Sequence, residues 1–226
     1  MNKYNSNSVA FAILVMLMCA CASSGNLKRR AYAYGWYPKN FKSIQKNYKN
    51  YLHFSNCQPG ETIASIGAGN GTSEVAISCF RDSIDWYLQE IDSSRLYQFN
   101  DVYNHFMTLR GSKIDDNFNL VIGTESSTNL PSNHFDRILM NNVYHELSDR
   151  ETILIDILAL LKDDGQLVIM EPMARKQGEK HANCKHSRLY EPDFLREMEQ
   201  FGFSLHHKEV VEKVSFLAYY TFAVRN

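Results

Sequence analysis

The sequence from residue 63 to residue 72 reads Ile63-Ala64-Ser65-Ile66-Gly67-Ala68-Gly69-Asn70-Gly71-Thr72. A short apolar run leads into three glycines at every second position, and a segment of helical character follows. Glycine lets the backbone turn tightly and approach a ligand with no Cβ in the way. A helix that begins after such a turn presents unpaired N–H groups and the positive end of its dipole. The stretch therefore predicts a strand, a glycine-rich turn and a helix, an arrangement that favours an anionic group such as a carboxylate.

The spacing of the glycines separates two classes of cofactor. A dinucleotide fingerprint, G-x-G-x-x-G, would need its third glycine at position 72, which is Thr72. The third glycine is instead Gly71, so that the pattern is G-x-G-x-G. A nicotinamide-dependent oxidoreductase is therefore the disfavoured alternative.

Strand-like and helix-like segments alternate on both sides of this turn. Such alternation favours a mainly parallel sheet covered by helices on both faces, in which ligands bind at the carboxyl ends of the strands. The expected strands are Thr62–Ile66, Ile84–Ile91, Phe118–Ile122, Phe135–Asn142, Gln166–Met170, Leu205–Val211 and Phe216–Val224. The expected helices of this region are Thr72–Phe80, Ser94–Leu109, Arg150–Leu161 and Pro192–Phe201.

The composition is that of an ordinary globular protein with one domain and an extension. Of 226 residues, 44% are hydrophobic and 22% are charged, which excludes wholesale disorder and a coiled coil. The net charge of −1 provides no overall field that would attract nucleic acid. We expect a leader over residues 1–26, a basic and aromatic extension with a helix over 27–60, and the α/β domain over 61–226.

The N-terminal segment differs in charge from the rest. Residues 1–60 contain eight Lys or Arg and no Asp or Glu. Val9–Ala22 is uncharged, but at 1.5 Å per residue it covers about 21 Å, short of the ~30 Å bilayer core. The end of this run resembles the lipobox of bacterial lipoproteins, with Cys21 as the lipidated residue. We therefore expect a membrane-associated lipoprotein; the alternatives are an uncleaved N-terminal anchor with the domain in the cytoplasm, and a buried apolar helix of the fold.

Five segments in order resemble class I S-adenosylmethionine-dependent methyltransferases. The resemblance covers the chain from about Asn40 to its C-terminus and rests on the segments together, since the glycine-rich turn alone is a weak motif. The segments are Ile66–Gly71, Leu88–Asp92, Gly123–Glu125 through Leu130-Pro131, Phe135–Leu147 and Leu160–Pro172.

The resemblance implies a Rossmann-like, seven-stranded α/β fold with strand order 3-2-1-4-5-7-6 and an antiparallel last strand. It also implies S-adenosylmethionine as cofactor, with Glu90 on the ribose hydroxyls, Thr124 and Glu125 by the adenine, and Asn141 near the methionyl end. The implied cofactor-binding residues are Gly67, Ala68, Gly69, Asn70, Gly71, Glu90, Ile91, Thr124, Glu125 and Asn141.

Two positions depart from the family pattern. Ser65 stands where an acid that helps to hold the cofactor's amino group is usual, and Thr124 stands where Asp is common. These departures motivate the alternative function, a non-catalytic, envelope-anchored binding protein on a methyltransferase fold. The first hypothesis is methyl transfer to a small-molecule acceptor.

Methyl transfer requires alignment above all, and a general base only where the acceptor arrives protonated. His145, just after the fourth expected strand, is the candidate base, because an imidazole with an ordinary pKa near 6.5 suits proton transfer at neutral pH. We expect it at the mouth of the acceptor site; the alternative is that it caps or packs the next helix.

The stretch Lys180–His186 contains two histidines and a cysteine. No second ligand pair accompanies them elsewhere, so we expect no metal site. The family resemblance places this stretch in a loop that often forms part of the acceptor pocket. Its lysines favour either an anionic acceptor or a solvated loop.

Overall fold

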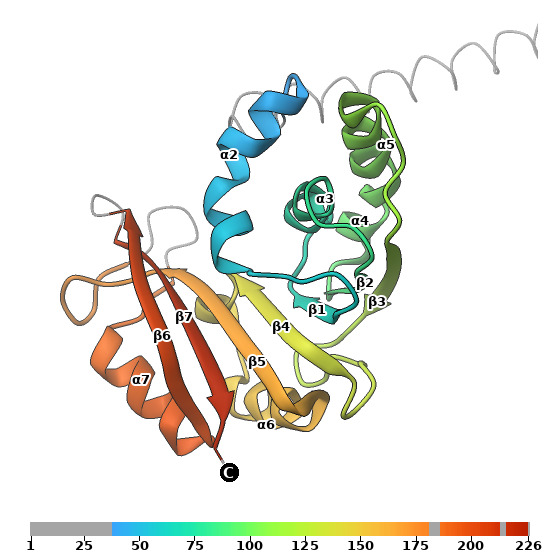
Figure 1. Ribbon diagram of the computed structural model, residues 1–226. Coiled ribbons are helices and arrows are strands. Elements are labelled where there is room, and N and C mark those ends of the chain that lie inside the picture. Colours follow the sequence, from blue (N-terminus) through green and yellow to red (C-terminus); the bar gives the residue numbers. More distant parts are fainter. Residues whose placement is uncertain (1–37, 181–185, 213–215, 226) are drawn as a thin grey trace, which may run out of the picture. The chain divides into compact units, whose positions relative to one another are not determined.

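The computed structural model describes residues 38–180, 186–212 and 216–225 (Figure 1). The chain divides into two compact units, one ending at Asn47 and the other beginning at Tyr48. Helix α2 (Phe41–Phe54) runs across this division and is the helix expected from the apolar spacing. It begins with a reciprocal cap: the Ser43 N–H donates to Asn40 Oδ1 (2.9 Å), while Ser43 Oγ accepts from the Asn40 N–H (3.1 Å).

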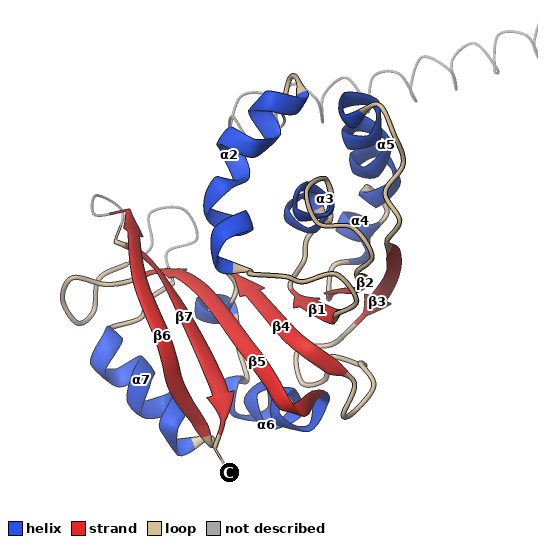
Figure 2. Cartoon of the chain, in the orientation of Figure 1, coloured by secondary structure: helices blue, strands red, loops and turns tan. Residues whose placement is uncertain are grey.

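The second unit contains a seven-stranded sheet in the order β3-β2-β1-β4-β5-β7-β6 (Figure 2). Neighbouring strands from β3 to β5 are parallel, and β7 is antiparallel to both of its neighbours. The expected fold class, strand order and antiparallel last strand are therefore confirmed. The strands are β1 (Thr62–Ile66), β2 (Asp85–Glu90), β3 (Asn117–Ile122), β4 (Phe135–Asn141), β5 (Leu161–Pro172), β6 (Phe203–Glu212) and β7 (Leu217–Val224).

Helices cover both faces of this sheet, as Figures 1 and 2 show. Helices α6 and α7 bury apolar residues against one face, in the main core cluster with β1, β4, β5 and β7. On the other face the Phe54 ring stacks on Tyr219 of β7, with the ring centroids 3.5 Å apart. The helices are α3 (Thr72–Ser78), α4 (Ser93–Leu96), α5 (Phe99–Arg110), the 3-10 turn η1 (Tyr144–Glu146), α6 (Arg150–Leu160) and α7 (Glu191–Gln200).

Two elements differ from the expectation. The helix expected over 94–109 is divided into α4 and α5, with Tyr97 and Gln98 between them. Strand β5 begins at Leu161 instead of Gln166, because Leu161 already pairs with Phe135 across a register shift. At Gly165 a Cβ would lie 2.9 Å from the Phe135 carbonyl oxygen, so glycine permits this close backbone approach.

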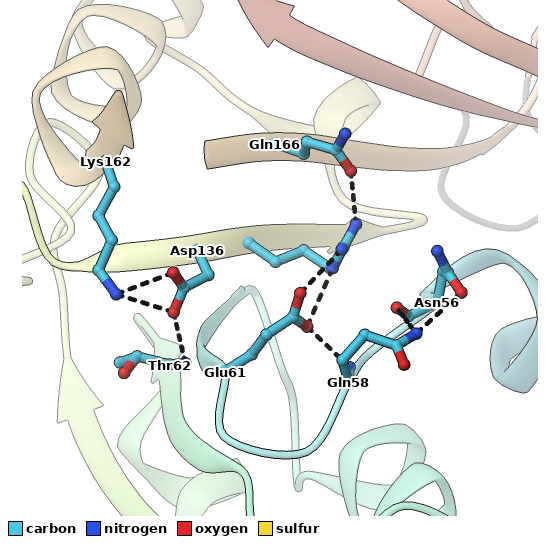
Figure 3. Close-up of polar contacts among 8 residues, drawn as sticks. Asn56, Gln58, Glu61, Thr62, Asp136, Lys162 and Gln166 are labelled. Atoms are coloured by element: carbon cyan, nitrogen blue, oxygen red, sulfur yellow. Dashed lines mark hydrogen bonds and ion pairs between the residues drawn. The ribbon is translucent and has the colours of Figure 1, made fainter. Parts of the chain in front are cut away.

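A polar network joins the amino ends of β1, β4 and β5 (Figure 3). The Arg137 guanidinium donates to Glu61 Oε1 (3.0 Å) and to Gln166 Oε1 (2.8 Å). Asp136 accepts from Lys162 Nζ (2.8 Å) and from the Thr62 N–H (2.9 Å). This network lies at the end of β1 opposite to the glycine-rich turn.

The predicted leader and its lipidation residue, Cys21, lie outside the described residues. None of the helices within the described ranges combines the length and the apolar character that crossing a bilayer requires.

Candidate active site

The order of the strands reverses direction at β1, whose neighbours are β2 and β4, and the glycine-rich turn leaves β1 at this point. Its three glycines adopt positive φ angles of 67°, 61° and 74°. A Cβ on Gly67 would lie 2.6 Å from Val143 Cγ2, and one on Gly71 would lie 2.8 Å from Leu88 Cδ1. At Gly69 the nearest atom would be Arg95 Nη1 at 3.9 Å. Neighbouring side chains therefore leave no room for a Cβ at Gly67 or Gly71. At Gly69, by contrast, the space where a Cβ would stand is open, and the backbone is accessible.

The Glu90 carboxylate lies beside this bare backbone. Its Oε2 accepts from the Gly69 N–H (2.9 Å), and its Oε1 accepts from the N–H groups of Ile91 (2.9 Å) and Asp92 (3.1 Å). The residue is buried, with 6% of its surface exposed. A carboxylate accepts at about four lone-pair positions and donates none, so it retains capacity for a ligand hydroxyl. The structure thus brings together two residues that the sequence assigned to one site.

Gln89 is a residue of this region that the sequence did not indicate. Its Oε1 accepts from the Gly67 N–H (3.2 Å), and its backbone carbonyl accepts from the Ala68 N–H (3.0 Å). A Cβ on Gly123 would lie 1.9 Å from Gln89 Nε2, so this side chain packs on the backbone that follows β3. The only indication in the sequence of this packing was Gly123, which directly follows the third strand.

The remaining predicted cofactor residues surround the turn less closely. Asn70 Oδ1 accepts from Thr72 Oγ1 (2.5 Å), so its side chain serves the start of α3. Thr124 and Glu125 are exposed in the loop after β3, where Glu125 Oε2 accepts from Ser148 Oγ (3.2 Å). The Ile91 side chain is exposed next to Glu90.

Ser65 is paired with an acid from the following helix. Its hydroxyl donates to Glu74 Oε1 (2.6 Å), and both residues are buried. Burial raises the pKa of Glu74, and the hydrogen bond from Ser65 opposes that shift. Glu74 of α3 thus places a carboxyl group beside Ser65. The sequence indicated this pair only through Glu74, an acidic residue three positions after Gly71.

His145 forms a buried pair with Glu171 at the ends of β4 and β5. His145 Nδ1 lies 2.8 Å from Glu171 Oε2, and the His145 N–H donates to Glu171 Oε1 (3.3 Å). Because an ionised carboxylate only accepts hydrogen bonds, a neutral imidazole in this contact would carry its proton on Nδ1 and would accept at Nε2. The Nε2 atom lies 3.7 Å from Glu146 Oε1. The His145 side chain is 2% exposed, so it is enclosed and does not stand at an open mouth.

The stretch Lys180–His186 is described only in part, since His181 and Cys184 fall outside the described ranges. His186 lies against His145, with the ring centroids 6.4 Å apart. Over the described residues, the acids, cysteines and histidines form no group that could hold a metal ion.

Residues 66–169 match the family model of a methyltransferase domain. The fold is similar to that of an S-adenosylmethionine-dependent methyltransferase from Aquifex aeolicus, with a TM-score of 0.63 and 17% identity over 81% of this chain and 97% of that chain. It is also similar to the mitomycin 7-O-methyltransferase MmcR, with a TM-score of 0.60 and 16% identity over 80% of this chain and 54% of that chain.

A third similar structure is the [4+2]-cyclase SpnF, with a TM-score of 0.63 and 14% identity over 81% of this chain and 82% of that chain. A comparison with curated protein sequences finds no match. The chain therefore has the fold of S-adenosylmethionine-dependent methyltransferases and a segment that matches their domain model, which supports this class.

Proposed function

We propose that the protein transfers the methyl group of S-adenosylmethionine to a small-molecule acceptor that arrives with an acidic proton, such as a hydroxyl. The observation that carries the proposal is the Glu90 carboxylate, held by three backbone N–H groups beside the bare backbone of Gly69. The Glu90 carboxylate only accepts hydrogen bonds, and it lies beside an open glycine turn at the carboxyl ends of parallel strands. These properties suit the diol of a nucleoside.

S-Adenosylmethionine supplies a methyl group on a positively charged sulfur. In the proposed site Glu90 would accept hydrogen bonds from the ribose hydroxyls, while Gly67, Gly69 and Gly71 would line the methionine part. Ala68, Asn70 and Ile91 would complete the turn and the strand tip, Thr124 and Glu125 would lie by the adenine, and Asn141 would lie near the methionyl end.

His145 acts as the general base in this proposal. Its Nε2 takes the proton of the acceptor, and the Glu171 carboxylate holds the Nδ1–H and stabilises the imidazolium that forms. Glu171 is thereby a positioning residue. One of the similar structures is named as an O-methyltransferase, which is consistent with a hydroxyl acceptor.

Replacing Glu90 with alanine is expected to weaken donor binding about tenfold to a hundredfold, because hydrogen bonds to a charged group are lost. Calorimetric titration of the protein with S-adenosylmethionine measures this change. Glu199→Gln, which removes an exposed charge paired with Arg225, is the control and should bind like the wild type.

A wild-type protein that gives no heat at millimolar donor would contradict the enzymatic proposal. It would favour the alternative, a non-catalytic binding protein on this fold. An unchanged affinity of Glu90→Ala would remove only Glu90 from the site.

We further propose that a lipid on Cys21 attaches the protein to a membrane. Labelled palmitate should be incorporated by the wild type and by Cys19→Ala, and Cys21→Ala should abolish the incorporation. Membrane fractionation without any label would instead favour the N-terminal anchor with the domain in the cytoplasm.

A further inference from the structure

One side of helix α2 presents a row of lysines. Lys42, Lys46 and Lys49 follow one another at spacings of four and three residues, and all three are exposed. At 3.6 residues per turn, these spacings keep the three side chains within about 60° of one another around the helix axis. We call these three residues the lysine stripe.

The opposite side of α2 is apolar and buried. Ile44 and Tyr48 are 0% and 6% exposed, and the Tyr48 ring lies against Phe106 of α5, with the ring centroids 6.1 Å apart. The helix is therefore amphipathic, and its lysines project away from the buried side. A flat anionic surface can contact them without displacing the helix.

The lysine stripe has no compensating acid within the described residues. None of its three lysines forms an ion pair there, whereas His53, further along the same side, has its Nε2 3.5 Å from Glu209 Oε2. Lysines three or four residues apart repel one another, and a lysine in the first turn opposes the helix dipole. The first turn of α2 contains no acid. The arrangement thus disfavours the helix, and an external anionic partner would offset that effect.

The stripe is the end of a longer basic run. Residues 28–49 contain seven Lys or Arg and no Asp or Glu, and this run follows the uncharged stretch Val9–Ala22. Clusters of about 4–8 basic residues next to a membrane attachment are typical of segments that bind anionic lipids. The remaining 16 bases and all 25 acids give residues 61–226 a net charge of −9. An anionic surface therefore attracts the N-terminal quarter of the chain and repels the rest.

Two features favour a lipid surface over nucleic acid. The stripe contains no arginine, whose forked guanidinium suits the two-point recognition of a phosphodiester. Its three cations are also few beside the roughly 6–10 phosphate contacts that a nucleic-acid-binding protein can make. Lysine is a strongly hydrated point charge, which suits a surface of mobile anionic headgroups.

We propose that the lysine stripe of α2 docks on a membrane surface that contains anionic lipids. Each lysine near such a surface strengthens binding about fivefold. The proposed lipid on Cys21 would keep the stripe close to the membrane, because the 20 residues from Cys21 to Phe41 span at most about 70 Å. The inference adds a second membrane contact to that lipid and does not depend on methyl transfer.

The test uses the full-length chain with Cys21→Ala, so that no lipid is attached at this residue. Vesicle sedimentation compares phosphatidylcholine vesicles with vesicles of phosphatidylcholine and phosphatidylglycerol. The protein should bind the anionic vesicles more tightly, and raising the salt from about 0.1 M to about 1 M should remove most of this preference. Lys42→Gln, Lys46→Gln and Lys49→Gln together should weaken binding to the anionic vesicles about a hundredfold and leave binding to the neutral vesicles unchanged.

The matched control removes the same charge from exposed positions outside α2. Lys113→Gln, Lys176→Gln and Arg196→Gln together should keep most of the preference for anionic vesicles. An equal loss in both triple variants overturns the proposal, because overall charge would then explain the binding. A protein that binds both kinds of vesicle equally also overturns it.

A charge-preserving variant keeps the test valid if the glutamine variant does not fold. Lys42→Arg, Lys46→Arg and Lys49→Arg together should bind the anionic vesicles like the parent protein, and a folded variant that does not would overturn the proposal. A labelled RNA hairpin is the competing ligand. Binding of the hairpin in preference to anionic vesicles, with loss of that binding in the glutamine variant, overturns the proposal in favour of nucleic acid. Donor binding should be the same in all of these variants, so a failure of the proposed methyl transfer is detected separately.

Discussion

Replacing His145 with asparagine is expected to lower kcat by about 10²–10⁴-fold, the usual contribution of a positioned general base. The ring is enclosed, and Glu171 fixes its orientation through Nδ1 at 2.8 Å. Asparagine cannot take a proton from the acceptor. The KM for the donor should change little, because Glu90 and the glycine-rich turn remain intact.

The measurement is the transfer of a radiolabelled methyl group to a panel of hydroxyl acceptors. The rate of His145→Asn should rise with pH and approach the wild-type rate once the acceptor ionises in solution, because the base is then no longer needed. Imidazole added to a His145→Ala variant should restore part of the activity. A merely structural role of the ring would give neither effect.

Glu171→Gln tests the positioning role separately. The amide can present its NH₂ group to Nδ1, which would move the imidazole proton to Nε2 and remove the acceptor nitrogen. We therefore expect a lower kcat with an unchanged KM for the donor. A His145→Asn variant that keeps wild-type turnover at every pH would show that the acceptor arrives as a free nucleophile.

The glycine-rich turn and Glu90 could be predicted from the sequence because they depend on local pattern and on topology. In a parallel sheet the carboxyl end of β2 lies beside the turn that follows β1. Glu90 at the end of β2 and Gly69 in that turn must therefore be close to each other. The observed hydrogen bond from the Gly69 N–H to Glu90 is the result of that topology.

The pairings of Ser65 with Glu74 and of His145 with Glu171 were not predictable in this way. Each joins a strand to a different element, over nine and 26 residues respectively. Whether two such side chains meet depends on helix rotation and rotamer choice, which the packing of the whole domain sets. The same packing extends β5 back to Leu161, whereas the sequence indicated a strand only from Gln166.

Replacing Arg137 with alanine is expected to destabilise the fold by about 1–3 kcal/mol, because it leaves the partly buried Glu61 carboxylate without its cation. The side chains of Arg137 and Glu61 are 8% and 18% exposed. The Gln166 amide oxygen loses its donor as well. Urea denaturation of both proteins measures the change in the free energy of unfolding.

Lys162→Met is the matched control at the same end of the sheet. Lys162 and Asp136 are 43% and 33% exposed, and such an ion pair contributes about 0–1 kcal/mol. The folded fraction of Arg137→Ala should bind the donor with wild-type affinity, since Glu61 precedes β1 and the glycine-rich turn follows it. A weaker affinity per folded molecule would mean that the network also shapes the site. An unchanged stability would mean that solvent already compensates Glu61, so that the amino ends of the strands do not depend on this pair.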